Sequence, residues 1–192
     1  MTPDVAVNFS WMIWAASWLL AASWADAAAK TQDFRAEIPY RVLIALGFVL
    51  VCAPFFERLP GALLCWGPGT LWRWLPLVFV IIGFGFTWWA RLHLGRLWSG
   101  RVARKTAHRI VETGPYAFVR HPIYTGLCLA ALATALERAA LTPLLGTVLV
   151  SLGFTLKARL EEDFLRQELG VEAYDAYARR VPMLVPFTAP RR

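Results

Sequence analysis

The sequence predicts an all-α, polytopic membrane protein with about five transmembrane helices. Its 192 residues have a mean hydropathy of +0.48, and 58% of them are hydrophobic while only 17% are charged. This composition is too apolar for an ordinary soluble domain of this size. Five apolar segments also approach the roughly 20 residues that a helix needs to cross a bilayer. We expect one membrane-embedded domain over residues 1–192.

The five apolar segments predict the helices in chain order. They cover approximately Val5 to Ala25, Ile38 to Phe56, Leu71 to Ala90, Ile123 to Leu136 and Ala139 to Leu156. Only Glu137 and Arg138 separate the last two segments, so we expect a tight hairpin of antiparallel helices.

The segment after the fifth apolar run predicts a helical extension on the cytoplasmic side. Leucine and phenylalanine residues between Leu156 and Leu169 form an apolar stripe with charged residues between them. Gly170 supplies a helix stop. We therefore expect the fifth helix to continue beyond the membrane.

Tryptophans gather near the ends of the apolar segments, which is typical of aromatic belts at membrane interfaces. They include Trp11, Trp14, Trp24, Trp72, Trp74, Trp88, Trp89 and Trp98.

The distribution of positive charge predicts the orientation in the membrane. Of the 20 Lys and Arg residues, 17 fall between the first two helices, in the connector Arg91 to His121, or in the tail Lys157 to Arg192. Cytoplasmic loops carry such an excess, so we expect the N-terminus outside and the C-terminus inside. The net charge of +7 then reflects this bias and attraction to membrane lipids, and we expect no nucleic-acid partner.

No metal site is expected. The three histidines, His93, His108 and His121, lie around one connector, but none forms a His-x-x-x-His pair or has an acidic partner at ligand spacing.

The segment Arg120 to Gly126 is the first candidate for a functional site. Pro122 suits the first turn of a helix, so His121 is expected at the helix start. The N–H groups and partial positive charge of a helix N-terminus suit a ligand carboxylate. Tyr124 falls in the first turn, and Gly126 would let a ligand or a neighbouring helix approach.

The pair Glu161-Glu162 is the second candidate, although Lys157 and Arg166 lie at i to i+4 spacing and could make it part of a solvated charge lattice. Successive helical residues point about 100° apart. At most one of the two glutamates therefore faces a given pocket, while the other pairs with an arginine.

Residues 91–186 resemble the isoprenylcysteine carboxyl methyltransferase family and its phospholipid N-methyltransferase relatives. The resemblance is carried by Arg120-His121-Pro122-x-Tyr124-x-Gly126, Glu161-Glu162, Gly170, Tyr174-x-x-Tyr177 and Val181-Pro182. Residues 1–90 are variable in such proteins, so nothing is carried over to them.

The resemblance implies a membrane enzyme that transfers a methyl group from S-adenosyl-L-methionine to a lipophilic acceptor, leaving S-adenosyl-L-homocysteine. The cofactor-binding residues it implies are His108, Arg109, Ile110, Val111, Tyr116, Arg120, His121, Pro122, Ile123, Tyr124, Gly126 and Glu161. The candidate catalytic residues are Lys157, Arg159 and Glu162. The family has a substrate-contacting arginine four residues before its glutamate, where this chain has Lys157, with Arg159 two residues later.

Two alternatives remain at this point. A membrane reductase of a sterol-like substrate would bind a nicotinamide cofactor, and a non-catalytic membrane subunit would use its basic loop to bind anionic lipids or a partner. The identity of the acceptor group and the oligomeric state stay open.

Overall fold

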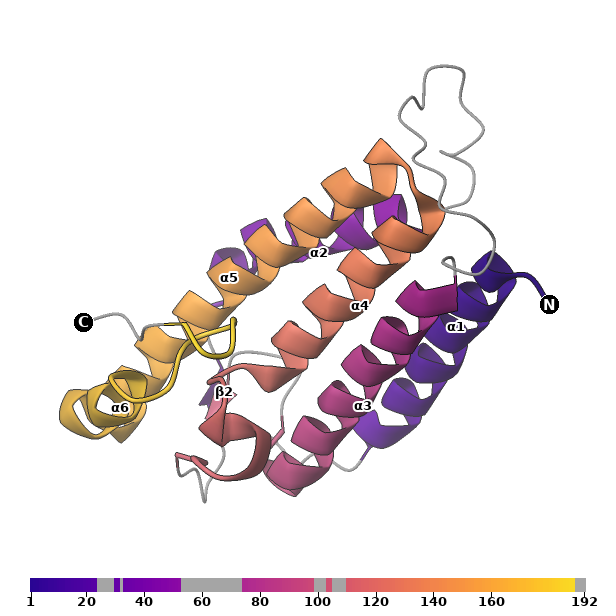
Figure 1. The fold of residues 1–192 in the computed structure, drawn as a ribbon. Helices are drawn as coiled ribbons and strands as arrows, with labels where there is room; N and C mark the ends of the chain where they lie inside the picture. The colour runs from indigo at the N-terminus through magenta and orange to yellow at the C-terminus, as the bar shows by residue number, and fades with distance from the viewer. Residues whose placement is uncertain (24–29, 32, 53–73, 99–102, 105–109, 189–192) are drawn as a thin grey trace.

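The structure is a computed structural model that describes residues 1–23, 30–31, 33–52, 74–98, 103–104 and 110–188 (Figure 1). Its α-helices are α1 (Pro3–Ala22), α2 (Phe34–Cys52), α3 (Leu75–Leu94), α4 (Pro122–Arg138), α5 (Leu141–Leu169) and α6 (Val171–Ala178). Two 3₁₀ turns, η3 (Gly95–Leu97) and η4 (Gly114–Ala117), and two short strands, β1 (Lys30–Thr31) and β2 (Ala103–Arg104), complete the described elements. The strands pair antiparallel.

The predicted all-α membrane architecture is confirmed. Each of the five expected apolar segments contains a long helix, and α1, α3 and α5 are long and apolar enough to cross a membrane by length and composition. The 29 residues of α5 extend about 43 Å, beyond a hydrocarbon core of roughly 30 Å. The expected extension of the fifth helix is therefore present, and it ends at Gly170, whose φ is 98°.

The hairpin between α4 and α5 is as tight as expected. Only Ala139 and Ala140 lie between the two helices. Ala139 adopts the left-handed conformation, with φ of 50° and ψ of 40°, and its N–H donates to the Ala135 carbonyl. The chain reverses over Ala139 and Ala140, because α4 continues through Glu137 and Arg138, which the sequence had placed between the helices.

The helices do not pack in chain order. α1 lies beside α3, α3 beside α4, and α4 beside α5, while α2 packs along α5 (Figure 1). The first and second helices therefore occupy opposite sides of the bundle, and α2 comes close to the C-terminal half of the chain.

Glycines allow the backbones of α3 and α4 to touch. A Cβ atom on Gly83 would lie 2.6 Å from the Gly126 carbonyl oxygen, and one on Gly126 would lie 2.5 Å from the Gly83 carbonyl oxygen. Small residues permit this close approach between membrane helices. Gly126 thus serves the contact with a neighbouring helix, one of the two possibilities that the sequence left open.

Replacing Gly83 by Ala is expected to lower the stability of the protein by about 1–3 kcal/mol, because the new methyl group meets backbone that cannot rotate away. The matched control is Gly85→Ala on the same helix, since a Cβ there meets nothing within 4 Å. Thermal unfolding in detergent micelles compares the two. Equal melting temperatures for both variants would contradict the close contact.

The third helix ends later than predicted, at Leu94 instead of Ala90. Arg91 is only 1% exposed, and its Nη2 and Nη1 donate to the carbonyls of Ala21 (2.8 Å) and Gly95 (2.6 Å). Its guanidinium also lies 4.5 Å from the centre of the Trp98 ring. Because these carbonyls and the Trp98 ring take up the guanidinium, the helix continues through an arginine that composition assigned to the connector.

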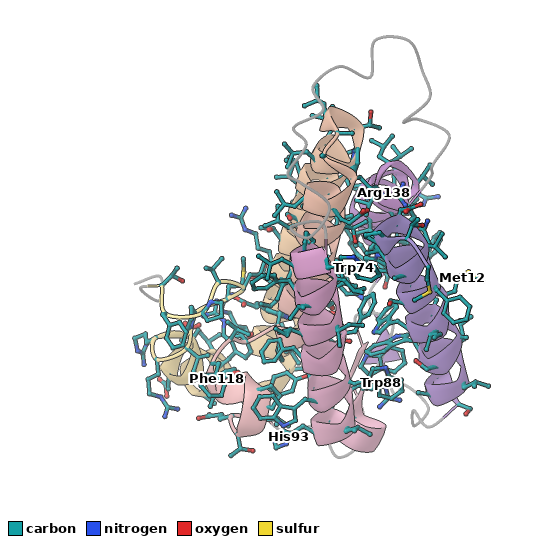
Figure 2. All side chains as sticks on the ribbon, turned by 45° about the vertical axis from the view of Figure 1, so that its right-hand side comes forward. Met12, Trp74, Trp88, His93, Phe118 and Arg138 are labelled. Atoms are coloured by element: carbon teal, nitrogen blue, oxygen red, sulfur yellow. The ribbon has the colours of Figure 1, made fainter. Side chains whose placement is uncertain are left out.

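Two of the tryptophans that the sequence assigned to an aromatic belt bond to neighbouring helices, one buried and one partly buried. Trp11 is 9% exposed, and its indole N–H donates to the hydroxyl of Thr134 on α4 (2.9 Å). Trp14 donates in the same way to Thr87 on α3 (2.8 Å). Each indole N–H therefore has a hydroxyl partner on a neighbouring helix. Figure 2 labels Trp88 where α3 approaches α1, whereas Met12 lies on the outer surface.

Candidate active site

The start of α4 is joined to the C-terminal segment through its backbone. The N–H groups of Arg120 and His121 donate to the carbonyls of Pro182 (2.9 Å) and Met183 (3.1 Å). The two polar regions that charge asymmetry assigned to one side of the membrane are therefore in direct contact. The His121 N–H is already used, so a ligand at this helix end would meet the N–H groups of the first turn, which have no acceptor within the helix.

A buried ion pair connects α4 to α5 and α6. Arg120 contacts Glu162 through two parallel bonds, Nε to Oε1 at 2.8 Å and Nη2 to Oε2 at 3.1 Å. Its Nη1 donates to the carbonyls of Ala178 (2.9 Å) and Val181 (2.6 Å). Both side chains are 6% exposed. Bidentate geometry of this kind fixes orientation as well as charge, so Arg120 holds three elements together.

His121 lies between the two glutamates. Its Nε2 is 3.1 Å from Glu162 Oε1, and its Nδ1 is 3.5 Å from Glu161 Oε2. A neutral imidazole has one N–H, whereas the charged ring can donate from both nitrogens. Burial alone would lower the pKa of His121, but the hydrogen bonds and charges of the two carboxylates outweigh burial and raise that pKa. The two carboxylates thus favour the charged form of the ring.

Glu161 faces a different set of partners from Glu162, as their helical spacing predicted. The Tyr124 hydroxyl lies 2.7 and 2.8 Å from the two Glu161 oxygens, and Lys157 Nζ lies 3.8 Å from Oε1. The Glu161 side chain is 18% exposed, three times the fraction for Glu162. Glu161 is therefore the more accessible carboxylate.

Aromatic rings stack through the middle of this cluster. The Tyr124 ring lies 5.4 Å from the His121 ring at 6° and 4.8 Å from the Phe154 ring at 11°. Lys157 Nζ lies 5.2 Å from the centre of the Tyr124 ring. The Lys157 ammonium and the Glu161 carboxylate therefore lie side by side, next to these stacked rings.

The two candidate cations of α5 point in different directions. Lys157 is 9% exposed and lies with Glu161 and Tyr124, whereas Arg159 is exposed. Residues two apart on a helix are separated by about 200°. Arg159 instead borders a cleft of about 690 Å³. That cleft is lined by Arg120, Thr155, Arg159, Glu162, Asp163, Arg166, Asp175, Ala178, Arg179, Pro182, Met183, Leu184, Val185 and Thr188.

Tyr116 is positioned by contacts on both sides. Its carbonyl accepts a hydrogen bond from the Tyr177 hydroxyl of α6 (2.7 Å), and its ring stacks on His93 at 6.3 Å and 27°. Burial raises the pKa of Tyr116 well above the usual value of 10.0, so the phenol stays neutral. Tyr177 of the Tyr174-x-x-Tyr177 motif therefore supports η4.

The remaining predicted site residues divide into three groups. Pro122 and Ile123 are buried in the first turn of α4, beside His121. Ile110 packs against the α6 tyrosines, and Val111 against the main core. His108 and Arg109 lie outside the described residues. No group of three His, Cys, Asp or Glu side chains in the described part of the chain could hold a metal ion.

Tyr40 of α2 is a neighbour of this cluster that sequence reasoning missed. Its ring centre lies 5.7 Å from Lys157 Nζ, and the residue is 4% exposed. A tyrosine near one end of a predicted span was the available signal, but nothing in the sequence shows that α2 packs along α5.

Comparison with known proteins places these residues in a family context. The isoprenylcysteine carboxyl methyltransferase (ICMT) family matches residues 75–167. A probable protein-S-isoprenylcysteine O-methyltransferase from Oryza sativa subsp. indica is 31% identical over 152 residues, which cover 76% of this chain and 79% of the relative. Protein-S-isoprenylcysteine O-methyltransferase B from Arabidopsis thaliana is 29% identical over 127 residues, covering 62% of this chain and 64% of the relative.

Proposed function

We propose that this chain, which belongs to the isoprenylcysteine carboxyl methyltransferase family, methylates the carboxylate of a lipophilic, isoprenylcysteine-like acceptor with S-adenosyl-L-methionine. Membership of the family and the apolar helices make it an integral membrane methyltransferase. The observation that most supports the finer proposal is the cluster of His121, Tyr124, Lys157 and Glu161, in which a partly accessible carboxylate and a cation lie side by side.

The side chains present fit the amino acid part of this cofactor. Glu161 is the more exposed of the two carboxylates and can accept hydrogen bonds from the cofactor's ammonium group. The first N–H groups of α4 suit its carboxylate. Tyr116 supplies a neutral aromatic ring for the adenosine part. The Tyr124 ring already stacks on His121 and Phe154, so Tyr124 acts through its hydroxyl, which holds Glu161, while Glu162 stays with Arg120. In this assignment the residues His121 to Tyr124 bind the cofactor, while Glu162 supports His121.

The cofactor supplies an electrophilic methyl group, whose bond to sulfur breaks as a bond to the acceptor oxygen forms. A carboxylate acceptor already carries the attacking lone pair, so no base is required. The protein mainly has to hold the reactants at near-attack distance. Of the two candidate cations, we favour Lys157 for orienting the acceptor, because it lies beside Glu161 and Tyr124, whereas Arg159 borders the cleft on the Glu162 side.

We also propose an orientation for the protein in the membrane. The excess of Lys and Arg in the segments that form the site supports a cytoplasmic active site, with the N-terminus outside. A lipophilic acceptor would then enter laterally from the bilayer.

Calorimetric titration of the detergent-purified protein with S-adenosyl-L-homocysteine tests the cofactor. We expect binding by the wild-type protein and a loss of at least about 30-fold in affinity for Glu161→Gln, since a charged partner of the ligand is removed. Asp163→Asn, with 67% of its side chain exposed, is the matched control and should bind as the wild type does.

Absence of binding by the wild-type protein would contradict the proposed cofactor. Binding of a nicotinamide dinucleotide phosphate in its place would favour the reductase alternative.

A further inference from the structure

Glycines set the register between α2 and α5. A Cβ atom on Gly47 would lie 2.7 Å from the Val150 nitrogen and 2.8 Å from the Gly146 carbonyl oxygen. One on Gly153 would lie 3.1 Å from the Ile44 nitrogen and 3.1 Å from the Tyr40 carbonyl oxygen. These contacts run in opposite directions along the two helices. One further turn along each helix brings Tyr40 to the level of Lys157.

The contacts of the two side chains agree with this register. Lys157 Nζ lies 5.7 Å from the Tyr40 ring centre and 5.2 Å from the Tyr124 ring centre, and 3.8 Å from Glu161 Oε1. The ammonium group is therefore held by two aromatic rings and one carboxylate, a geometry that favours a cation. One of those rings comes from the helix that the family resemblance does not cover.

The hydroxyl group of Tyr40 lies near Glu37 and Arg41 of the same helix. Its oxygen is buried and has no hydrogen-bond partner within 3.5 Å in the described part of the chain. The neighbouring Glu37 and Arg41 bond to each other, with Arg41 Nε 3.0 Å from Glu37 Oε2. A buried hydroxyl without a partner costs free energy, so such a group is commonly one that a ligand satisfies.

We propose that Tyr40 is an acceptor-binding residue, whose hydroxyl donates a hydrogen bond to the carboxylate of the acceptor while Lys157 balances its charge. This inference rests on the proposed function, because it assumes an anionic acceptor at Lys157. The other nearby phenol is not available for this task, since the Tyr124 hydroxyl already donates to Glu161. The negative charge of Glu161 repels the acceptor carboxylate. The acceptor therefore needs a cation, Lys157, and a neutral hydrogen-bond donor, Tyr40, to hold it there.

The test compares an acidic ligand with its neutral counterpart on protein saturated with S-adenosyl-L-homocysteine, which prevents turnover. The probes are N-acetyl-S-farnesylcysteine and its carboxamide, titrated into wild-type protein and Tyr40→Phe. We expect the wild type to prefer the acid. In Tyr40→Phe the affinity for the acid should fall about 5- to 10-fold, as for one lost hydrogen bond, while affinity for the carboxamide changes less than about 2-fold.

Tyr174→Phe is the matched control, because it removes the hydroxyl of another buried tyrosine, on α6. It should keep the preference for the acid. An unchanged preference for the acid in Tyr40→Phe would overturn the inference. An equal loss of affinity for the acid, the carboxamide and S-adenosyl-L-homocysteine would also overturn it, because it would indicate a structural role. Failure of wild-type protein to bind S-adenosyl-L-homocysteine would instead reject the proposed function itself, and it is recognised before any variant is compared.

Discussion

Replacing Glu162 by Gln is expected to lower the free energy of unfolding by about 3–5 kcal/mol, because it leaves the buried charge of Arg120 without its counter-ion. This is a large share of the roughly 5–15 kcal/mol that stabilises a typical protein. Arg120 would retain its bonds to the carbonyls of Ala178 and Val181, but neutral acceptors do not balance a buried guanidinium. Thermal unfolding in detergent micelles, followed by circular dichroism, measures the loss.

Two further variants separate the ion pair from a general effect of losing a carboxylate. Asp163→Asn changes the adjacent, exposed position, and its free energy of unfolding should stay within about 0.5 kcal/mol of the wild-type value. The double variant Arg120→Met with Glu162→Met removes both charges and should recover much of the stability that Glu162→Gln loses. A Glu162→Gln protein as stable as the wild type would show that the pair does not hold α4 to α5.

Replacing Lys157 by Met is expected to reduce kcat/KM for a carboxylate acceptor by about 100- to 1,000-fold, equivalent to roughly 3–4 kcal/mol for one desolvated charge contact. Met keeps the length and apolar stem of the lysine, so the packing against Tyr124 is retained. Arg159→Met is the matched comparison on the same helix and should change kcat/KM less than about 3-fold, since Arg159 is exposed and points away from Glu161 and Tyr124. Initial rates with a radiolabelled methyl donor provide the measurement.

The opposite ranking would move the acceptor to the cleft beside Arg159. Affinity for S-adenosyl-L-homocysteine, measured on the same proteins, separates an effect on the acceptor from an effect transmitted through Glu161. A Lys157→Met protein that loses only cofactor affinity would contradict the assigned role.

The long helices could be predicted because each depends on local composition. Apolar segments of about 20 residues must be helical in a bilayer, since their backbone groups have no other partners. The continuation of α3 through Arg91 could not be predicted, because it depends on the Ala21 carbonyl of a different helix. The burial of Trp11 likewise depends on a hydroxyl group 123 positions away in the chain.

The candidate site was predictable where helical geometry decides it. Glu161 and Glu162 share His121, but their other contacts differ as the angle between successive residues predicts, and Arg120 pairs with Glu162. The choice between Lys157 and Arg159 depends on which neighbour covers each face of α5, and one sequence does not contain that information. Tyr40 was missed for the same reason, because glycine contacts between helices distant in sequence determine where α2 lies.

The backbone bonds between the start of α4 and the C-terminal segment have a consequence for biosynthesis. Arg120 needs the carbonyls of Ala178 and Val181, and its own N–H bonds to Pro182. Synthesis runs from the N-terminus, so the ribosome adds about 60 further residues after Arg120 before these acceptors exist. Arg120 therefore lacks these partners until residues 178–182 have been synthesised, and the candidate site cannot be completed before then.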